Sequence, residues 1–110
     1  MADTFDWPGA SGKTYKYYIH ELPWRPSDEH DGNYIFAKVV SQVWHAVYIG
    51  QGHLQTRYDA AMNEGCVNEK NATHYHVHTQ SSKATREAEE KDLIAGNPEC
   101  QWPAGCNGHD

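Results

Sequence analysis

A tyrosine, two glycines and an arginine follow one another closely in the segment VYIGQGHLQTR, residues 47–57. Tyr48 ends a run of β-branched and aromatic residues, Gly50 and Gly52 interrupt that run, and Arg57 lies in the segment that follows. A tyrosine at a strand end, a glycine turn and an arginine in the first turns of a helix together make a polar concavity. Because helix N-termini attract anions, this arrangement predicts a phosphate-binding site.

The elements that must position these residues follow from the apolar pattern. Residues 33–40 and 43–49 predict two strands joined by a short turn, and therefore an antiparallel hairpin that can place Tyr34 on the same sheet as Tyr48. Gly50 is expected to end the second strand. A helix starting at residue 54 follows, because its apolar residues recur at offsets of three and four.

The second half of the chain predicts a loop, a third strand and a second helix. Residues 63–73 have the glycine and asparagine content of a loop, and residues 74–78 alternate with a period of two. Ser81 or Ser82 can cap the last helix, which Gly96 is expected to stop. The predicted fold is α+β: a small three-stranded antiparallel sheet flanked by helices, in the order β-β-α-β-α.

The N-terminal third is predicted to be an extension of this fold, over residues 1–31. Residues 1–13 have the composition of a mobile arm without a stable element, whereas residues 15–20 could form one extra strand at an edge. With 110 residues the chain is expected to form one domain, over residues 32–107, followed by a short tail, residues 108–110.

Composition narrows the classes of function. The formal charge of −6 and the pI near 5.7 disfavour a long unselective grip on nucleic acid, although a local basic site is allowed. No apolar run approaches the roughly 20 residues of a membrane span. The cysteines, Cys66, Cys100 and Cys106, are odd in number and lack a CxxC pair, which is typical neither of a disulfide scaffold nor of a zinc knuckle. The expected location is a reducing cytoplasm.

Five short motifs in this order resemble the GIY-YIG nuclease superfamily, and the likeness covers residues 32–107. They are GNY from Gly32, YIG from Tyr48, Arg57 in the next helix, Glu90 in EKDLI, and Asn107 in PAGCN. The run HVHTQSSKATREAEEKDLI also resembles a branch of small stand-alone bacterial domains. The chain departs from the family at Asn33, where the first motif usually has isoleucine, and in a longer tail that makes Asn97 a rival of Asn107.

The resemblance implies metal-dependent endonuclease activity on DNA, with Mg²⁺ or Mn²⁺ as the cofactor and no obligatory organic cofactor. Tyr34 would act as general base or would position the attacking water, and Tyr48 would be its hydrogen-bonding partner. Arg57 would bind the phosphoryl group, and Glu90 would hold the metal ion in a shell completed by water and phosphate. A phenol has an unperturbed pKa of about 10, so Tyr34 would need a neighbouring cation to act as base. Gly32, Gly50 and Asn107 would support the site.

Each of these residues also has a purely structural interpretation. The two tyrosines can be strand aromatics that pack on a half-buried face, and Arg57 can be a solvated helix charge. Glu90 lies in the charged stretch REAEEKD, in which Glu87 and Glu89 compete for the metal role. A non-catalytic binding module that keeps the fold is therefore the alternative function.

Alternating histidines at His74, His76 and His78 raise a third possibility, a zinc site on one strand face. A solvent-facing polar row on an antiparallel strand is the more economical interpretation.

Overall fold

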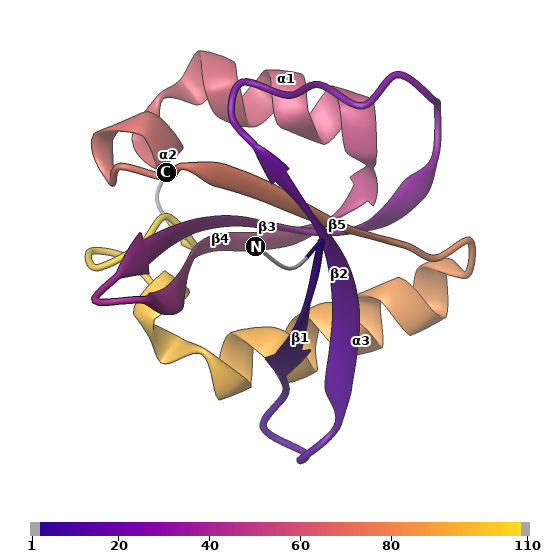
Figure 1. Ribbon diagram of the computed structural model, residues 1–110. Helices are drawn as coiled ribbons and strands as arrows, with labels where there is room; N and C mark the ends of the chain where they lie inside the picture. Colours follow the sequence, from indigo (N-terminus) through magenta and orange to yellow (C-terminus); the bar gives the residue numbers. More distant parts are fainter. Residues whose placement is uncertain (1–2, 109–110) are drawn as a thin grey trace.

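In the computed structural model, which describes residues 3–108, the strands form one five-stranded sheet with helices on both faces (Figure 1). The strand order is β1-β2-β5-β3-β4, and every neighbouring pair is antiparallel. The strands span Thr4–Pro8 (β1), Thr14–Glu21 (β2), Asp31–Val40 (β3), Val43–His53 (β4) and His74–Thr79 (β5). The helices span Leu54–Glu64 (α1), Cys66–Glu69 (α2) and Lys83–Gly96 (α3), and Pro98–Cys100 forms a 3-10 turn.

The N-terminal segment corrects the sequence prediction. An α+β protein agrees with the structure, but the predicted three-stranded sheet is wrong, because β1 and β2 extend it. β1 lies in the predicted mobile arm, and β2 is an interior strand between β1 and β5. Long-range packing explains both differences. Trp7 of β1 and Tyr17 of β2 are buried in a hydrophobic cluster with residues from distant parts of the chain, although the sequence around them is rich in turn residues. Residues 1, 2, 109 and 110, which belong to the predicted arm and tail, lie outside the described residues.

The β3–β4 hairpin agrees with the prediction and carries both tyrosines. Ser41 and Gln42 form its turn with positive φ angles of 52° and 66°. The register shifts between Phe36 and Ala37, because Phe36 pairs with Tyr48 whereas Ala37 pairs with Ala46. This β-bulge leaves an extra residue in β4 and keeps Tyr48 on the sheet face of Phe36 and Tyr34.

Gly50 and Gly52 do not end β4, contrary to the prediction. β3 begins at Asp31, so its first residues pair with Gly52 and His53 and carry the ladder through both glycines. α1 starts at the next residue, where the His53 side chain accepts a hydrogen bond from the Thr56 backbone N–H. The strand therefore passes directly into the helix that carries Arg57.

The sheet separates two hydrophobic clusters. One lies under α1 and α2 and contains four buried aromatic residues, Tyr34, Phe36, Tyr58 and Tyr75. The other lies under α3 and contains Trp7, Tyr17, Ile35, Ile49 and Leu93. α1 and α3 thus cover opposite faces, as Figure 1 shows. No helix within residues 3–108 is long and apolar enough to cross a bilayer.

The histidines of β5 are not a solvent-facing row, so that expectation is wrong. His74 is 8% and His76 0% exposed, because β5 is an interior strand covered by β1 and β4 aromatics. His76 Nδ1 accepts a hydrogen bond of 2.9 Å from the Trp7 indole N–H. Within residues 3–108 no group of three or more His, Cys, Asp or Glu side chains is arranged to hold a metal ion, so the zinc alternative gains no support.

The burial of His76 predicts that the protein loses stability in acid. Desolvation first, and then the neighbouring His74 and His20, lower the pKa of His76 to about 3, against about 6.5 in an unfolded chain. Between these pH values the unfolded chain binds a proton that the folded protein does not bind. The stabilising contribution is therefore complete above about pH 6.5 and is lost as the pH falls toward 3, by at most about 1.4 kcal/mol per pH unit.

Urea unfolding between pH 7 and pH 4 measures this effect. We expect the free energy of unfolding of the wild-type protein to fall more steeply than that of His76→Gln. The matched control is His30→Gln, since His30 is exposed. Equal slopes for all three proteins would contradict the assignment to His76.

Candidate functional site

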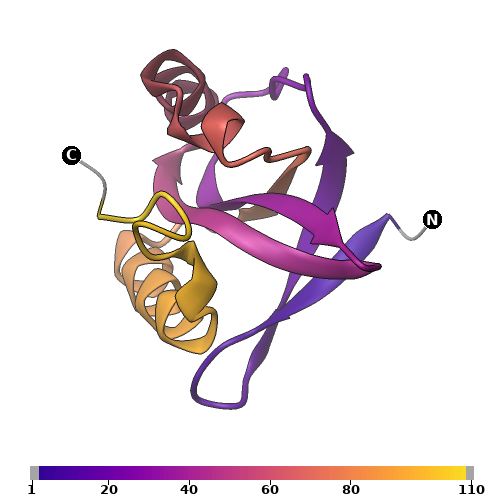
Figure 2. The ribbon, with the colours of Figure 1, turned by 90° about the vertical axis from the view of Figure 1, so that its left-hand side faces the viewer.

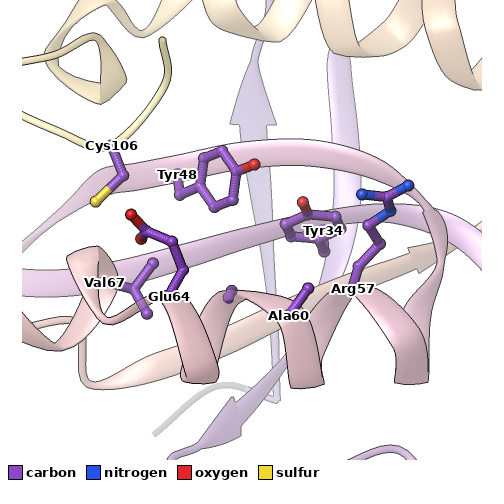
Figure 3. Close-up of a pocket in the computed structure, with 8 residues that line it drawn as sticks. Tyr34, Tyr48, Arg57, Ala60, Glu64, Val67 and Cys106 are labelled. Atoms are coloured by element: carbon purple, nitrogen blue, oxygen red, sulfur yellow. The ribbon is translucent and has the colours of Figure 1, made fainter. Parts of the chain in front are cut away.

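An elongated pocket of about 200 Å³ lies between the sheet and α1 (Figure 3). Its lining combines polar groups from three elements with small and apolar side chains: Tyr34, Tyr48, Arg57, Ala60, Ala61, Glu64, Val67 and Cys106. In Figure 3, Tyr34 and Arg57 lie side by side at one end, and Val67 and Cys106 lie at the other. The helical residues are spaced by three and four, so they form one stripe along α1. Three of the four predicted catalytic residues therefore meet in this pocket.

The two phenols meet because Gly50 leaves space for one of them. Tyr34 and Gly50 are paired across β3 and β4, and the Tyr34 ring leans over the glycine. A Cβ atom at position 50 would overlap the Tyr34 hydroxyl and the adjacent ring carbons. The Tyr34 and Tyr48 rings then pack edge to face, with centroids 5.8 Å apart and an interplanar angle of 74°. Gly32 has a different role, since a Cβ there would overlap the His78 carbonyl oxygen of β5.

The Tyr34 hydroxyl is held in its protonated form. Only 2% of the residue is exposed. Burial first, and then the hydrogen bond and charge of Tyr48, raise the pKa of Tyr34 well above its ordinary value, while Arg57 opposes the rise. Arg57 is a neighbouring cation of the kind that a tyrosine base would need. Its lowering effect on the pKa of Tyr34 is smaller than the raising effect of burial. In this environment Tyr34 is a hydrogen-bond donor rather than a phenolate.

Arg57 differs from the other two arginines in its partners. Arg25 forms a bidentate ion pair with Asp59, at 2.9 and 3.0 Å. Arg86 is buried and donates hydrogen bonds to the Gln51 side chain and to backbone carbonyls. Within residues 3–108 the Arg57 guanidinium has no hydrogen bond or ion pair with another side chain. It lies at the exposed end of the pocket, where an anionic group can reach it.

Glu90 does not line the pocket. It is carried by α3, which packs on the opposite face of the sheet, next to the edge strand β4. Its carboxyl is half-buried, and burial, together with the nearby Glu87, raises its pKa while Arg57 opposes the rise. The carboxyl of Glu90 is therefore within electrostatic range of the Arg57 guanidinium, past the edge of the sheet. Of its rivals, Glu89 is engaged elsewhere, 3.4 Å from His78.

The Asn107 side chain forms two hydrogen bonds with the backbone of the edge strand β4, beside the pocket. Its side-chain amide donates to the Ile49 carbonyl and accepts from the Ile49 N–H, both at 2.8 Å. Ile49 lies between Tyr48 and Gly50, so the C-terminal segment fixes the part of β4 that carries the pocket. The rival Asn97 instead donates to the carbonyls of Pro8 and Leu93, under α3.

A disulfide between Cys66 and Cys106 joins α2 to the C-terminal segment. This bond corrects the expectation that the cysteines form no disulfide, because their 40-residue separation hides a proximity that only the folded chain creates. Cys100 remains a free, buried thiol.

The sequence did not predict a role for Glu64, which lines the pocket and whose carboxylate accepts a 2.9 Å hydrogen bond from the Cys66 N–H. Glu64 lies at the start of the predicted loop, residues 63–73, and this position did not predict a role in a pocket.

Replacing Gly50 with alanine should lower the stability of the protein and displace Tyr34, although it adds only one methyl group. The added methyl group would push the Tyr34 ring out of its place, and overpacking of this kind typically costs about 1–3 kcal/mol. Chemical denaturation of Gly50→Ala measures the loss. The double variant Gly50→Ala/Tyr34→Ala is the control, since the cost of the methyl group should shrink once the ring is absent. Additive losses would show that the overlap with Tyr34 is not the cause.

Comparison of the chain with known proteins found no matching family model, no matching curated protein and no matching solved structure.

Proposed function

We propose that this protein hydrolyses DNA phosphodiester bonds as a metal-dependent endonuclease of the GIY-YIG type. The observation that carries the proposal is the meeting of Tyr34, Tyr48 and Arg57 in one pocket, with the guanidinium at its exposed end. These groups come from β3, β4 and α1, and the Glu90 carboxyl of α3 is within electrostatic range of the arginine. The proposal is supported by the types of the three pocket groups, because phosphoryl transfer needs groups that position the phosphate and stabilise the charge that grows on it.

The residues divide the work according to their environments. Arg57 would bind the non-bridging phosphoryl oxygens and stabilise the negative charge that grows on them. Tyr34, which stays protonated, would donate its hydroxyl hydrogen to a phosphoryl oxygen or orient the attacking water through its oxygen atom. Tyr48 would hold the Tyr34 hydroxyl in place. The pocket therefore supplies positioning and charge stabilisation, and the raised pKa of Tyr34 disfavours its role as a phenolate base.

Glu90 fits a magnesium ion through its chemistry. Mg²⁺ keeps several waters and is often bound by one or two carboxylates together with substrate phosphates, so a single half-buried glutamate is a sufficient protein ligand. The absence of a preformed cluster of three ligands in residues 3–108 is compatible with such a site. When bound, the ion would supply Lewis-acid stabilisation of the phosphate.

Supercoiled plasmid nicking in Mg²⁺ or Mn²⁺ tests the proposal. We expect nicking by the wild-type protein that a chelator abolishes, and we expect Glu90→Gln to need at least about ten-fold more Mg²⁺, since it removes the charged oxygen ligand. Glu87→Gln is the matched control on the same helix. The proposal fails if no metal supports nicking of plasmid or branched DNA, or if Glu90→Gln nicks with the wild-type metal dependence.

A non-catalytic binding module is the second candidate. It is favoured by one observation, the position of Glu90 outside the pocket on the other face of the sheet. Such a module would bind DNA through Arg57 without cleaving it under any metal condition.

A further inference from the structure

A basic and aromatic patch lies just beyond the Cys106 end of the pocket. It consists of Lys38, Lys70 and Trp102. The Lys70 ammonium lies 4.9 Å from the centre of the Trp102 ring, and the Lys38 ammonium donates a 3.2 Å hydrogen bond to the Lys70 carbonyl oxygen. Trp102 is 45% exposed, which is unusual for the largest apolar side chain. The patch thus presents an indole surface beside two positive charges.

The patch is joined to the pocket through covalent and hydrogen bonds. Lys70 follows α2, whose Val67 lines the pocket, and its backbone N–H donates to the Cys66 carbonyl at 2.9 Å. The Trp102 backbone N–H donates to the Asn107 carbonyl at 2.8 Å, next to Cys106. The Cys66–Cys106 disulfide links the two segments, and Figure 2 shows the C-terminal segment beside α2. These bonds therefore fix the position of the patch relative to the pocket.

We propose that this basic and aromatic patch binds a single-stranded flank of the DNA whose phosphodiester occupies the pocket, an inference that rests on the proposed function. An indole can stack on an unpaired base, and lysines neutralise the adjacent phosphates. A paired base cannot offer its face in this way. The net charge of −6 disfavours an extended grip on duplex DNA but leaves such a local contact possible.

The length of α1 sets the length of flank that can reach the patch. Arg57 lies seven residues before the end of this helix and the patch lies beyond that end, so the two are separated by at least about 10 Å at roughly 1.5 Å per residue. Stacked nucleotides advance by about 3.4 Å each, so at least about three nucleotides are needed to span this distance. Shorter flanks would reach the pocket but not Trp102.

The charges around the patch limit its electrostatic contribution. Glu69 precedes Lys70, and Glu99 lies near Lys38 in a shallow depression on the same side. Two lysines facing phosphates would give a salt slope of roughly −1.4 for a single strand, because each neutralised phosphate contributes about −0.7. Stacking on Trp102, rather than charge, should supply most of the contact.

Fluorescence anisotropy in the presence of a chelator tests the proposal without cleavage. The probes are labelled hairpins with single-stranded flanks of 0, 2, 4, 6 and 8 nucleotides. We expect the affinity to rise once the flank exceeds about three nucleotides. Trp102→Ala should bind the long flanks at least about five-fold more weakly than the wild type does, and should bind the blunt hairpin equally well. Trp102→Phe should retain part of the affinity gained from the flank. Lys70→Gln should make the slope of log affinity against log salt concentration less negative by about 0.7.

A second exposed cation–π pair, Lys16 and Tyr18 of β2, provides the matched control. Tyr18→Ala and Lys16→Gln should bind every probe as the wild type does. Thermal melting of each variant verifies that it is folded. Affinity that is independent of flank length, or equal for wild type and folded Trp102→Ala, would overturn the proposal, as would an equal gain with any negatively charged polymer that lacks bases.

The binding assay and the nicking assay test the patch proposal and the proposed function independently of each other. If long flanks bind through Trp102 but no metal supports nicking, the patch stands and the hydrolase assignment fails. If the protein nicks plasmid DNA but flank length has no effect on binding, the hydrolase assignment stands and the patch proposal fails.

Discussion

Replacing Arg57 with alanine should lower the rate of DNA cleavage by about 10²- to 10³-fold, the loss that usually follows removal of one group that stabilises developing charge. The guanidinium has no competing partner among the described side chains and lies beside the Tyr34 hydroxyl in Figure 3. It is therefore placed to meet the phosphoryl oxygens as their charge grows. Single-turnover cleavage of a labelled oligonucleotide, with protein in excess, measures the chemical step directly.

Two further variants show whether the geometry or only the charge of Arg57 matters. Arg57→Lys keeps the positive charge but loses the planar, bidentate fork, so we expect an intermediate rate. Arg25→Ala is the matched control, because Arg25 lies on the surface in an ion pair with Asp59. Cleavage by Arg57→Ala at the wild-type rate would remove the basis of the enzyme assignment.

Removal of the Cys66–Cys106 disulfide should cost roughly 4 kcal/mol of stability, because it releases a loop of about 40 residues in the unfolded chain. Since 1 kcal/mol shifts the Tm of a domain of this size by roughly 4–8 °C, the double variant Cys66→Ser/Cys106→Ser should melt roughly 15–30 °C lower. Thermal unfolding followed by circular dichroism measures the shift. The pocket should be affected too, because Cys106 lines it and precedes Asn107.

A dithiol reductant provides the control for the disulfide. It should lower the Tm of the wild-type protein toward that of the double variant and leave the double variant itself unchanged. If the wild-type protein contains three free thiols by titration and melts at the same temperature with and without reductant, the disulfide does not form and the prediction is wrong.

The sequence predicted the local elements of this fold with good accuracy. Period-two alternation identified β3, and the recurrence of Leu54, Tyr58 and Ala61 at helical spacing identified α1, on whose inner face all three are buried. Ser82, one of the two residues predicted as the cap, caps α3. These features succeed because each depends on residues that are neighbours along the chain.

The predictions that failed all involve partners far apart in the sequence. β1 forms because Trp7 is buried and bonds to His76, which lies 69 residues away. The histidines of β5 alternate like a polar row, yet His74 and His76 are buried because Trp7 of β1 and Trp44 of β4 pack over them. Neither the composition around Trp7 nor the period of the histidines contains this information.

The candidate site divides in the same way. The types of its residues, two phenols, a guanidinium and a carboxylate, and the strand, turn and helix that carry them are determined by the sequence itself, since residue chemistry and short-range periodicity are local properties. Only the tertiary structure decided that a β-bulge turns Tyr48 toward Tyr34, that Gly50 makes room for the ring, and that Glu90 lies outside the pocket that Arg57 lines. Strand register, the sheet face that a side chain occupies and the set of residues that meet in a pocket depend on how the whole chain packs, and no short stretch of residues specifies them.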